Sequence, residues 1–203
     1  MTAGGLCEDR HVAVEAVVFD VGETLVDETN MWTRAAASGG ITPFTLMAGL
    51  GATIALERPH SDVWELLGIA HPAGEWTMDD WYPDALPALA RLRAAGYRIY
   101  ASGNAPTFVE DDLRPHFDGV ASAESWGVWK PEAAFFDRVV ELAGVPADKI
   151  AYVGDRVDTD VGPALAAGMV AVHVRRGPWG YLQTPPDRAI RIASLDELPA
   201  VLP

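Results

Sequence analysis

The 203-residue sequence has little cysteine and little positive charge. Its single cysteine, Cys7, excludes a disulfide scaffold and a zinc site built from cysteines. Fifteen lysines and arginines face 29 aspartates and glutamates, which gives a formal net charge of −14 at pH 7. A chain this acidic repels nucleic acid and anionic membranes over most of its surface, so we expect neither as a partner. Any anion that the protein binds needs its own local positive charge.

Secretory and membrane-spanning signals are also missing. Residues 1–10 carry acidic side chains and no apolar core, so we expect a disordered tail there. The stretch 35–56 has no charged residue and is long enough to cross a bilayer, but it contains four glycines and a proline. We interpret this stretch as a buried helix of a globular, cytoplasmic protein. It is also a candidate surface for a homodimer.

Hydrophobic residues make up 49% of the chain and charged residues 22%, a balance typical of a globular protein. Short β-rich runs alternate with helical runs, which predicts an α/β fold with a parallel sheet. The expected strands cover 14–20, 97–102, 118–122, 149–153 and 169–174. Helices are expected over 84–96, 131–144 and 158–167, and Ser194 and Glu197 are spaced to cap a short terminal helix. Residues 175–188 are expected to form a surface loop.

About sixty residues after the first expected strand break this alternation. Segments 31–37, 43–56 and 61–67 have helical patterns, and Asp62 and Glu65 are spaced to cap the last one. A helical insertion at this point lies over the carboxyl ends of the strands, where open α/β sheets bind ligands. We therefore expect an α/β core of residues 11–26 and 82–203 and a helical cap of residues 27–81. An extra packing layer without a gating role remains the alternative.

Four polar residues fall at the ends of expected strands or just past one: Asp20, Ser102, Lys130 and Asp155. Each is a weak signal alone, because such residues often only cap loops or face solvent. In a parallel sheet, however, all four converge on one edge. Two carboxylates, a hydroxyl and an ammonium group at one edge suit a divalent metal ion and a phosphoryl group.

The order of these residues resembles that of the haloacid dehalogenase superfamily, and of its phosphatase-like branch in particular. The resemblance is carried by Asp20-Val21-Gly22-Glu23-Thr24, Ser102, Lys130-Pro131, and Gly154-Asp155 with Asp158 and Asp160. Four motifs in order are far more specific than any one of them. The resemblance covers residues 14–174 and implies a Rossmann-like, doubly wound sheet. It places the Asp20 strand in the middle and a small helical cap after it.

The resemblance also implies roles for individual residues. Asp20 is the nucleophile that attacks the phosphorus of a small phosphorylated molecule and forms an aspartyl phosphate. Mg²⁺ is held by Asp20, the carbonyl group of Gly22 and Asp155, and Asp160 supports it directly or through water.

The remaining roles concern the phosphoryl group. By the same resemblance, Ser102, the N–H of Gly103 and the adjacent Asn104 are expected to bind the phosphoryl oxygens. Lys130 neutralises charge on the nucleophile and on the transferring group.

One position departs from the family pattern. The phosphatases usually carry a second aspartate two residues after the nucleophile, which protonates the leaving group and then activates water. Here that position is Gly22, which has no side chain. A carboxylate of the cap, such as Glu28 or Glu57, or an acid on the substrate could take over this step. Glu23 is disfavoured, because adjacent residues of an extended segment point in opposite directions.

Gly22 also leaves two other functions open. One is a phospho-ligand-binding protein with weak or no turnover. The other is a metal-independent hydrolase of carbon–halogen bonds, although the Gly-Asp motif with Asp160 favours phosphoryl chemistry.

Arginines and tryptophans near the expected site have two interpretations. Arg156, Arg175 and Arg176 could hold an anionic substrate, but we favour solvated loop charges. The tryptophans of the expected cap could line a pocket, but we favour core packing. They are Trp32, Trp64, Trp76 and Trp81.

Overall fold

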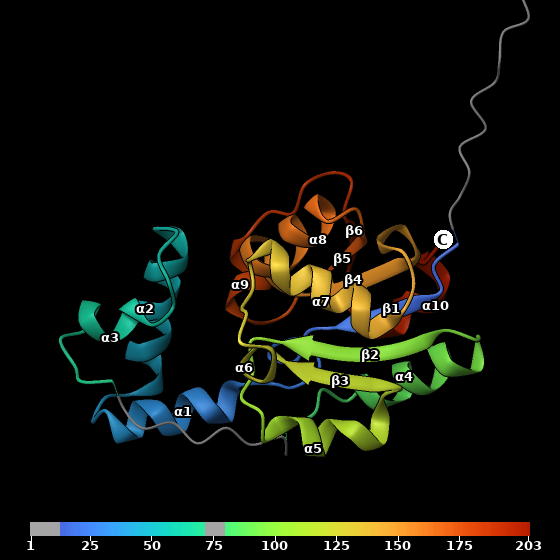
Figure 1. Ribbon diagram of the computed structural model, residues 1–203. Coiled ribbons are helices and arrows are strands. Elements are labelled where there is room, and N and C mark those ends of the chain that lie inside the picture. Colours follow the sequence, from blue (N-terminus) through green and yellow to red (C-terminus); the bar gives the residue numbers. More distant parts are fainter. Residues whose placement is uncertain (1–12, 72–79) are drawn as a thin grey trace, which may run out of the picture.

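The computed structural model describes residues 13–71 and 80–203 (Figure 1). The expected tail of residues 1–10, with Cys7, and Trp76 lie outside the described residues. Six strands form one sheet in the order β3-β2-β1-β4-β5-β6, and each neighbouring pair is parallel. They are β1 (Ala16–Phe19), β2 (Arg98–Gly103), β3 (Gly119–Ser122), β4 (Ile150–Gly154), β5 (Val170–Val174) and β6 (Ile190–Ile192). The predicted doubly wound α/β fold is confirmed.

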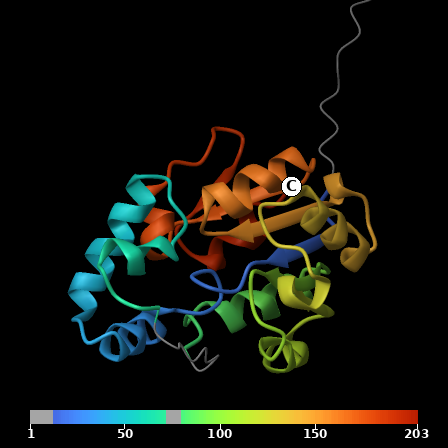
Figure 2. The same ribbon diagram turned by 60° about the vertical axis from the view of Figure 1, so that its left-hand side comes forward.

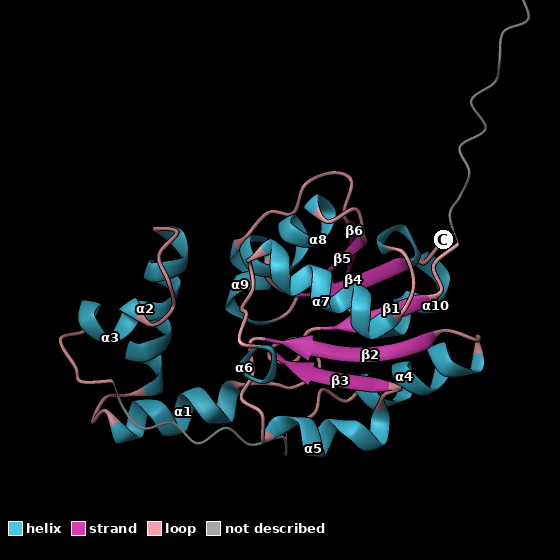
Figure 3. Cartoon of the chain, in the orientation of Figure 1, coloured by secondary structure: helices cyan, strands magenta, loops and turns pink. Residues whose placement is uncertain are grey.

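Helices cover both faces of the sheet, which is why β1 reads as a continuous apolar run (Figure 3). Ala16 and Val18 of this strand belong to one core cluster, and Val17 and Phe19 belong to the other, because side chains alternate along a strand. The first cluster lies under α7 (Ala133–Ala143) and α8 (Gly162–Ala166). The second lies under α4 (Ala85–Ala94), α5 (Val109–Leu113) and α10 (Leu198–Val201).

Short elements complete the core. They are α6 (Ala123–Trp126), α9 (Gly177–Leu182), a π-helical turn η3 (Val157–Val161), and the 3-10 turns η1 (Arg114–His116), η2 (Ala147–Lys149) and η4 (Leu195–Glu197). The expected capping box at Ser194 and Glu197 is confirmed. The prediction of a surface loop over 175–188 is wrong, because α9 lies there and buries Trp179. The three-residue strand β6 was also not predicted.

The insertion between β1 and α4 contains α1 (Thr29–Ser38), α2 (Pro43–Ala55) and α3 (Asp62–Leu66), close to the three predicted segments. These helices share their own apolar cluster, which Trp179 of α9 joins. Thr42 caps α2 by accepting a hydrogen bond from the amide of Thr45, whereas the expected cap by Asp62 is absent from α3 as described. Figures 1 and 2 show the insertion beside the carboxyl ends of the strands, next to α9. No described helix is long and apolar enough to cross a membrane.

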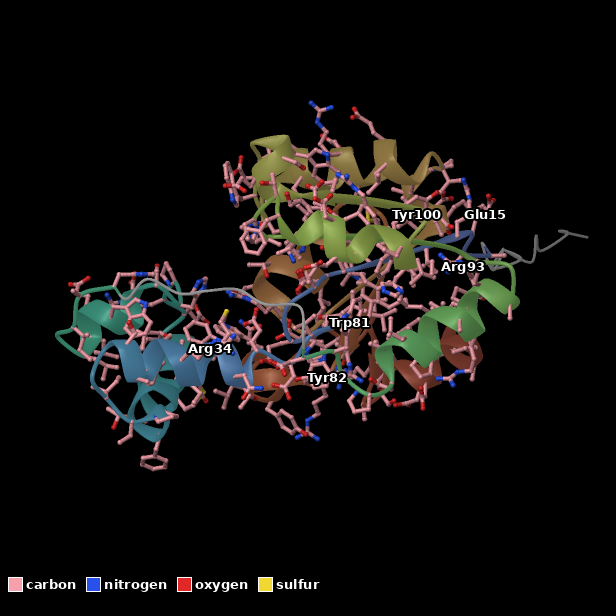
Figure 4. All side chains as sticks on the ribbon, turned by 90° about the horizontal axis from the view of Figure 1, so that it is seen from below. Glu15, Arg34, Trp81, Tyr82, Arg93 and Tyr100 are labelled. Carbon is pink, nitrogen blue, oxygen red and sulfur yellow. The ribbon has the colours of Figure 1, made fainter. Side chains whose placement is uncertain are left out.

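Two adjacent chain segments join the insertion to the core. Val26 and Trp81 form an antiparallel bridge, and the amide of Tyr82 donates to the carbonyl of Leu25 at 2.9 Å. Figure 4 shows Trp81 and Tyr82 where the insertion meets the sheet. The insertion therefore starts and ends at one place, beside the loop that follows β1.

Arg176 fixes the loop after β1 to the rest of the core. The side chain is buried, donates to the carbonyl of Thr24 at 2.8 Å and pairs with Asp84 just before α4. Asp84 also accepts a hydrogen bond from Ser194 at 2.6 Å. The interpretation of Arg176 as a solvated loop charge is therefore wrong, while the neighbouring Arg175 is exposed as expected.

We predict that Arg176→Met lowers the free energy of unfolding by about 3 kcal/mol. The substitution removes the cation that partners Asp84 and leaves the Thr24 carbonyl without its donor. Urea unfolding followed by circular dichroism measures this change. Arg175→Met is the matched control and should change stability by less than about 0.5 kcal/mol, because that side chain is exposed. Equal losses in the two variants would contradict the structural role of Arg176.

Candidate active site

A cavity of about 330 Å³ lies at the carboxyl edge of the sheet. It adjoins β1 and β4, between which the strand order reverses, and open α/β sheets bind ligands at such switch points. Residues at the ends of strands and residues of the insertion both line it. The cavity therefore brings the predicted polar residues together with side chains from the insertion.

Lys130 lies between two carboxylates at this cavity. Its Nζ atom donates to Asp20 Oδ1 at 2.6 Å and to Asp160 Oδ1 at 2.5 Å, and its side chain is only 3% exposed. Burial alone would lower the pKa of Lys130, but the carboxylates of Asp160 and Asp20 hold this pKa well above its usual range. The ammonium group therefore stays charged and bridges the two carboxylates.

Asp155 brings a third carboxylate to the same place. Oxygen atoms of Asp20, Asp155 and Asp160 all lie within 4.8 Å of one another. Asp155 Oδ2 is buried and has no hydrogen-bond partner in the described part of the chain. Burial raises the pKa of Asp155 well above its usual range, and the charges of Asp160 and Asp20 raise it further.

This donor set fits a hard divalent cation such as Mg²⁺. The three carboxylates offer oxygen ligands, and one ammonium group does not balance their charge. Asp155 has an unpaired oxygen, whereas both oxygens of Asp160 accept hydrogen bonds, from Lys130 and from the amide of Arg156 at 3.0 Å. Asp155 is therefore better suited than Asp160 to direct contact with a cation.

The predicted phosphate-binding turn follows β2. Asn104 donates to the carbonyl of Lys130 at 3.0 Å and accepts from its amide at 2.8 Å, so the side chain of Asn104 positions the Lys130 loop. Ser102 and Gly103 are not among the described residues that line the cavity. Ser102 Oγ is nevertheless buried without a hydrogen-bond partner among residues 13–71 and 80–203.

Gly103 allows the nucleophile candidate to lie against this turn. A Cβ atom at position 103 would lie 2.3 Å from Asp20 Oδ1. Any larger residue would displace the carboxylate that contacts Lys130. Glycine is therefore required here by the position of Asp20.

Gly22 makes room for a carboxyl group in a similar way. A Cβ atom at position 22 would lie 2.2 Å from Glu28 Oε1 and 2.9 Å from Glu28 Cδ. Glu28 lies just before α1, and its Oε2 atom accepts a hydrogen bond from Trp32 Nε1 at 3.1 Å. Burial raises the pKa of Glu28 to about 8, and the charge of Glu23 adds to this effect.

The other two candidate carboxylates are placed differently. Glu23 lines the cavity, but its oxygens accept hydrogen bonds from the Glu28 amide at 3.1 Å and from the Tyr82 hydroxyl at 2.6 Å. Burial raises the pKa of Glu23, and its φ of 51° lies in the left-handed region. Glu23 therefore holds the linker to the insertion. Glu57 is exposed and is not among the described residues of the cavity lining.

Aromatic residues enclose another part of the cavity. Trp32, Trp64 and Trp179 line it and also belong to the buried cluster of the insertion, so both interpretations hold for Trp32 and Trp64. His60 lies between Trp32 and Trp179, with ring centroids 6.2 Å and 6.1 Å away, and burial lowers its pKa. Trp179 was missed because its segment was expected to be a loop, although its apolar residues could have indicated a buried turn.

Arg156 adds a second cation to the lining. Its guanidinium group lies 4.7 Å from the ring centroid of Trp179 and pairs with Asp158 at 2.6 Å. The favoured interpretation of Arg156 as a solvated charge is therefore wrong. Arg156 and Lys130 give this acidic chain positive charge at the cavity.

We predict that Asp155→Asn stabilises the protein in EDTA, because it removes a carboxyl group whose charged form is disfavoured by burial and by two neighbouring carboxylates. Urea unfolding measures the change, and Asp148→Asn, at an exposed position, is the control and should have no effect. Added Mg²⁺ should stabilise the wild type, by about 2.7 kcal/mol at a hundred times its Kd, but not Asp155→Asn. Equal stabilisation of both proteins by Mg²⁺ would contradict a role of Asp155 in cation binding.

Residues 14–168 match the family model of the haloacid dehalogenase-like hydrolases. The chain is 31% identical over 123 residues to a glyceraldehyde 3-phosphate phosphatase of Methanocaldococcus jannaschii, covering 58% of this chain and 54% of that protein. It is 38% identical over 104 residues to a glyceraldehyde 3-phosphate phosphatase of Methanopyrus kandleri, covering 48% and 45%. The chain thus spans about half the length of these relatives.

A solved structure extends the likeness over nearly the whole chain. The HAD hydrolase YfnB of Bacillus subtilis, bound to magnesium, has a TM-score of 0.69 at 16% identity and covers 94% of this chain and 99% of that one. At this identity the match shows the fold alone. Because the family model covers most of the chain, the chain belongs to the haloacid dehalogenase-like hydrolases.

Proposed function

We propose that the protein is a Mg²⁺-dependent phosphatase that hydrolyses a small phosphorylated molecule through an aspartyl phosphate on Asp20. The main support is the buried group of Asp20, Lys130, Asp155 and Asp160 at the cavity. It combines a nucleophilic carboxylate, a fixed cation and a donor set that suits Mg²⁺. The names of the sequence relatives agree with phosphoryl chemistry.

In this proposal the side chains around Asp20 prepare its carboxylate for attack. Lys130 fixes Asp20 Oδ1 and supplies positive charge for the phosphoryl oxygens, while Asp160 holds Lys130 in place. We propose that the buried hydroxyl of Ser102, which has no partner in the described part of the chain, and the N–H of Gly103, which lies against Asp20, bind the phosphoryl oxygens. Asp20, Asp155 and the Gly22 carbonyl would hold Mg²⁺, which supplies Lewis-acid stabilisation of charge on those oxygens.

We propose further that residues 27–81 act as a cap on this site. The cavity has walls from both the insertion and the core, and its volume of about 330 Å³ suits a small metabolite. Trp32 and Trp64 contribute apolar surface from the insertion, and Trp179 contributes it from the core. Such walls exclude water from the reacting phosphorus and contact the organic part of the substrate.

The two other candidate functions would require different features of the site. A carbon–halogen hydrolase would not need a buried carboxylate with an unpaired oxygen such as that of Asp155. A protein that only binds phospho-ligands would not need a nucleophile fixed by Lys130. Both features favour phosphatase activity.

We predict Mg²⁺-dependent phosphate release from at least one member of a panel of aryl, acyl, sugar and nucleotide phosphates. Asp20→Asn should lower this release about a thousandfold or more, because an amide oxygen is a far weaker nucleophile than a carboxylate. Asp148→Asn is the matched control, because that aspartate is exposed and is not among the described residues that line the cavity. Colorimetric phosphate measurement with and without EDTA reports the rates.

Three results would contradict the proposal. Undiminished activity of Asp20→Asn would show that Asp20 is not the nucleophile. Tight binding of inorganic phosphate without release from any ester would indicate a binding protein. Release of halide from a 2-haloacid without metal would indicate the carbon–halogen hydrolase.

A further inference from the structure

We propose that Glu28 supplies the proton to the leaving group and then activates water, in place of the aspartate that is absent at position 22. This inference rests on the proposed phosphatase function. It assigns a catalytic residue to the linker between β1 and α1.

The first argument is the position of the Glu28 carboxyl group. Its Oε1 atom lies 2.2 Å from the point where a Cβ atom of residue 22 would be. This separation is close to the distance between the Cβ atom of an aspartate and its own carboxylate oxygens. A carboxyl oxygen therefore occupies the space that the side chain of an aspartate at position 22 would fill.

The second argument is that this position is fixed on two sides. Trp32 Nε1 donates to Glu28 Oε2 at 3.1 Å, so Oε1 is the oxygen directed toward Gly22. The amide of Glu28 donates to Glu23, which Tyr82 holds in turn. Because both the backbone and the carboxyl group of Glu28 are anchored, the carboxyl group is preorganised for proton transfer.

The third argument is that Glu28 and Asp20 line the same cavity. A phosphoryl group attacked by Asp20 has its leaving oxygen on the far side of phosphorus, within the cavity that the insertion closes. Glu28 comes from the linker to that insertion. A side chain at position 22 would displace the Glu28 carboxyl group from the place that it holds in this structure.

The two proposed steps balance as follows. An oxygen of Asp20 bonds to phosphorus, the bond from phosphorus to the ester oxygen breaks, and the ester oxygen takes the proton of Glu28 and leaves as an alcohol. A water oxygen then bonds to phosphorus and gives its proton to Glu28, while the bond from phosphorus to Asp20 breaks and restores the aspartate. The net reaction consumes one water and releases one alcohol and one phosphate.

The first test replaces Glu28 by glutamine, which keeps an acceptor for Trp32 but cannot transfer the proton. It uses aryl and alkyl phosphates that the wild type hydrolyses, ordered by the basicity of the leaving group. The expected loss in kcat is about a hundred- to ten-thousandfold for alkyl phosphates. With 4-nitrophenyl phosphate we expect a burst of nitrophenol and trapped aspartyl phosphate, because water attack becomes limiting. Glu57→Gln, an exposed glutamate after α2, is the matched control and should behave as the wild type.

The second test moves the carboxyl group back to position 22. Glu28→Ala opens the space, and Gly22→Asp in the same chain fills it with an aspartate. With alkyl phosphates, the kcat of the double variant should be at least about tenfold higher than that of Glu28→Ala. A purely structural role of Glu28 through Trp32 predicts no recovery in the double variant.

Two outcomes overturn the inference while the proposed function stands. One is a wild-type kcat for alkyl phosphates in Glu28→Gln. The other is an equal loss for every leaving group, with no burst and no recovery in the double variant. The proposed function fails separately when the wild type releases no phosphate or Asp20→Asn keeps its activity, and that failure overturns the inference as well.

Discussion

The ion pairs of Lys130 with Asp20 and Asp160 are the interaction on which the site depends. Removing three charges from water is costly, and only short contacts in a preformed pocket offset that cost. The parallel sheet supplies such a pocket, because β1 and β4 run side by side and end at the same edge. Asn104 then fixes the backbone of Lys130 through two hydrogen bonds. The position of one ammonium group therefore depends on three separate segments of the chain.

This arrangement concentrates negative charge that the protein alone does not neutralise. Five carboxyl groups line or adjoin the cavity, and Asp155 keeps an oxygen without a partner in the described part of the chain. Such unfavourable groups are common where function requires them, since stability elsewhere compensates for them. Arg176 gives an example of that compensation, because it bonds to the carbonyl of Thr24 in the loop after β1 and pairs with Asp84. Local instability and ion binding are therefore two consequences of the same side chains.

The sequence predicts the parts of this molecule that depend on local pattern. Apolar runs mark β1 and β4, because strands buried on both faces show no alternation, and polar residues at strand ends meet wherever strands are parallel. The pattern does not reveal α9, β6 or the burial of Arg176, because these depend on contacts with distant segments. Nor does it choose between Glu28 and Glu57, because only the folded insertion decides which of them reaches Gly22. Glu28 Oε1 lies beside Gly22, whereas Glu57 is exposed and is not among the described residues of the cavity lining.

The position of Glu28 has a consequence for how the insertion takes part in catalysis. A general acid in the loop of the nucleophile keeps its geometry whatever the insertion does. Glu28 instead precedes α1 and bonds to Trp32, which also lines the cavity and packs within the insertion. A displacement of α1 would thus move the proton donor and an aromatic wall together. Substrate enclosure and proton transfer then become one event, and water reaches the phosphorus only when both are in place.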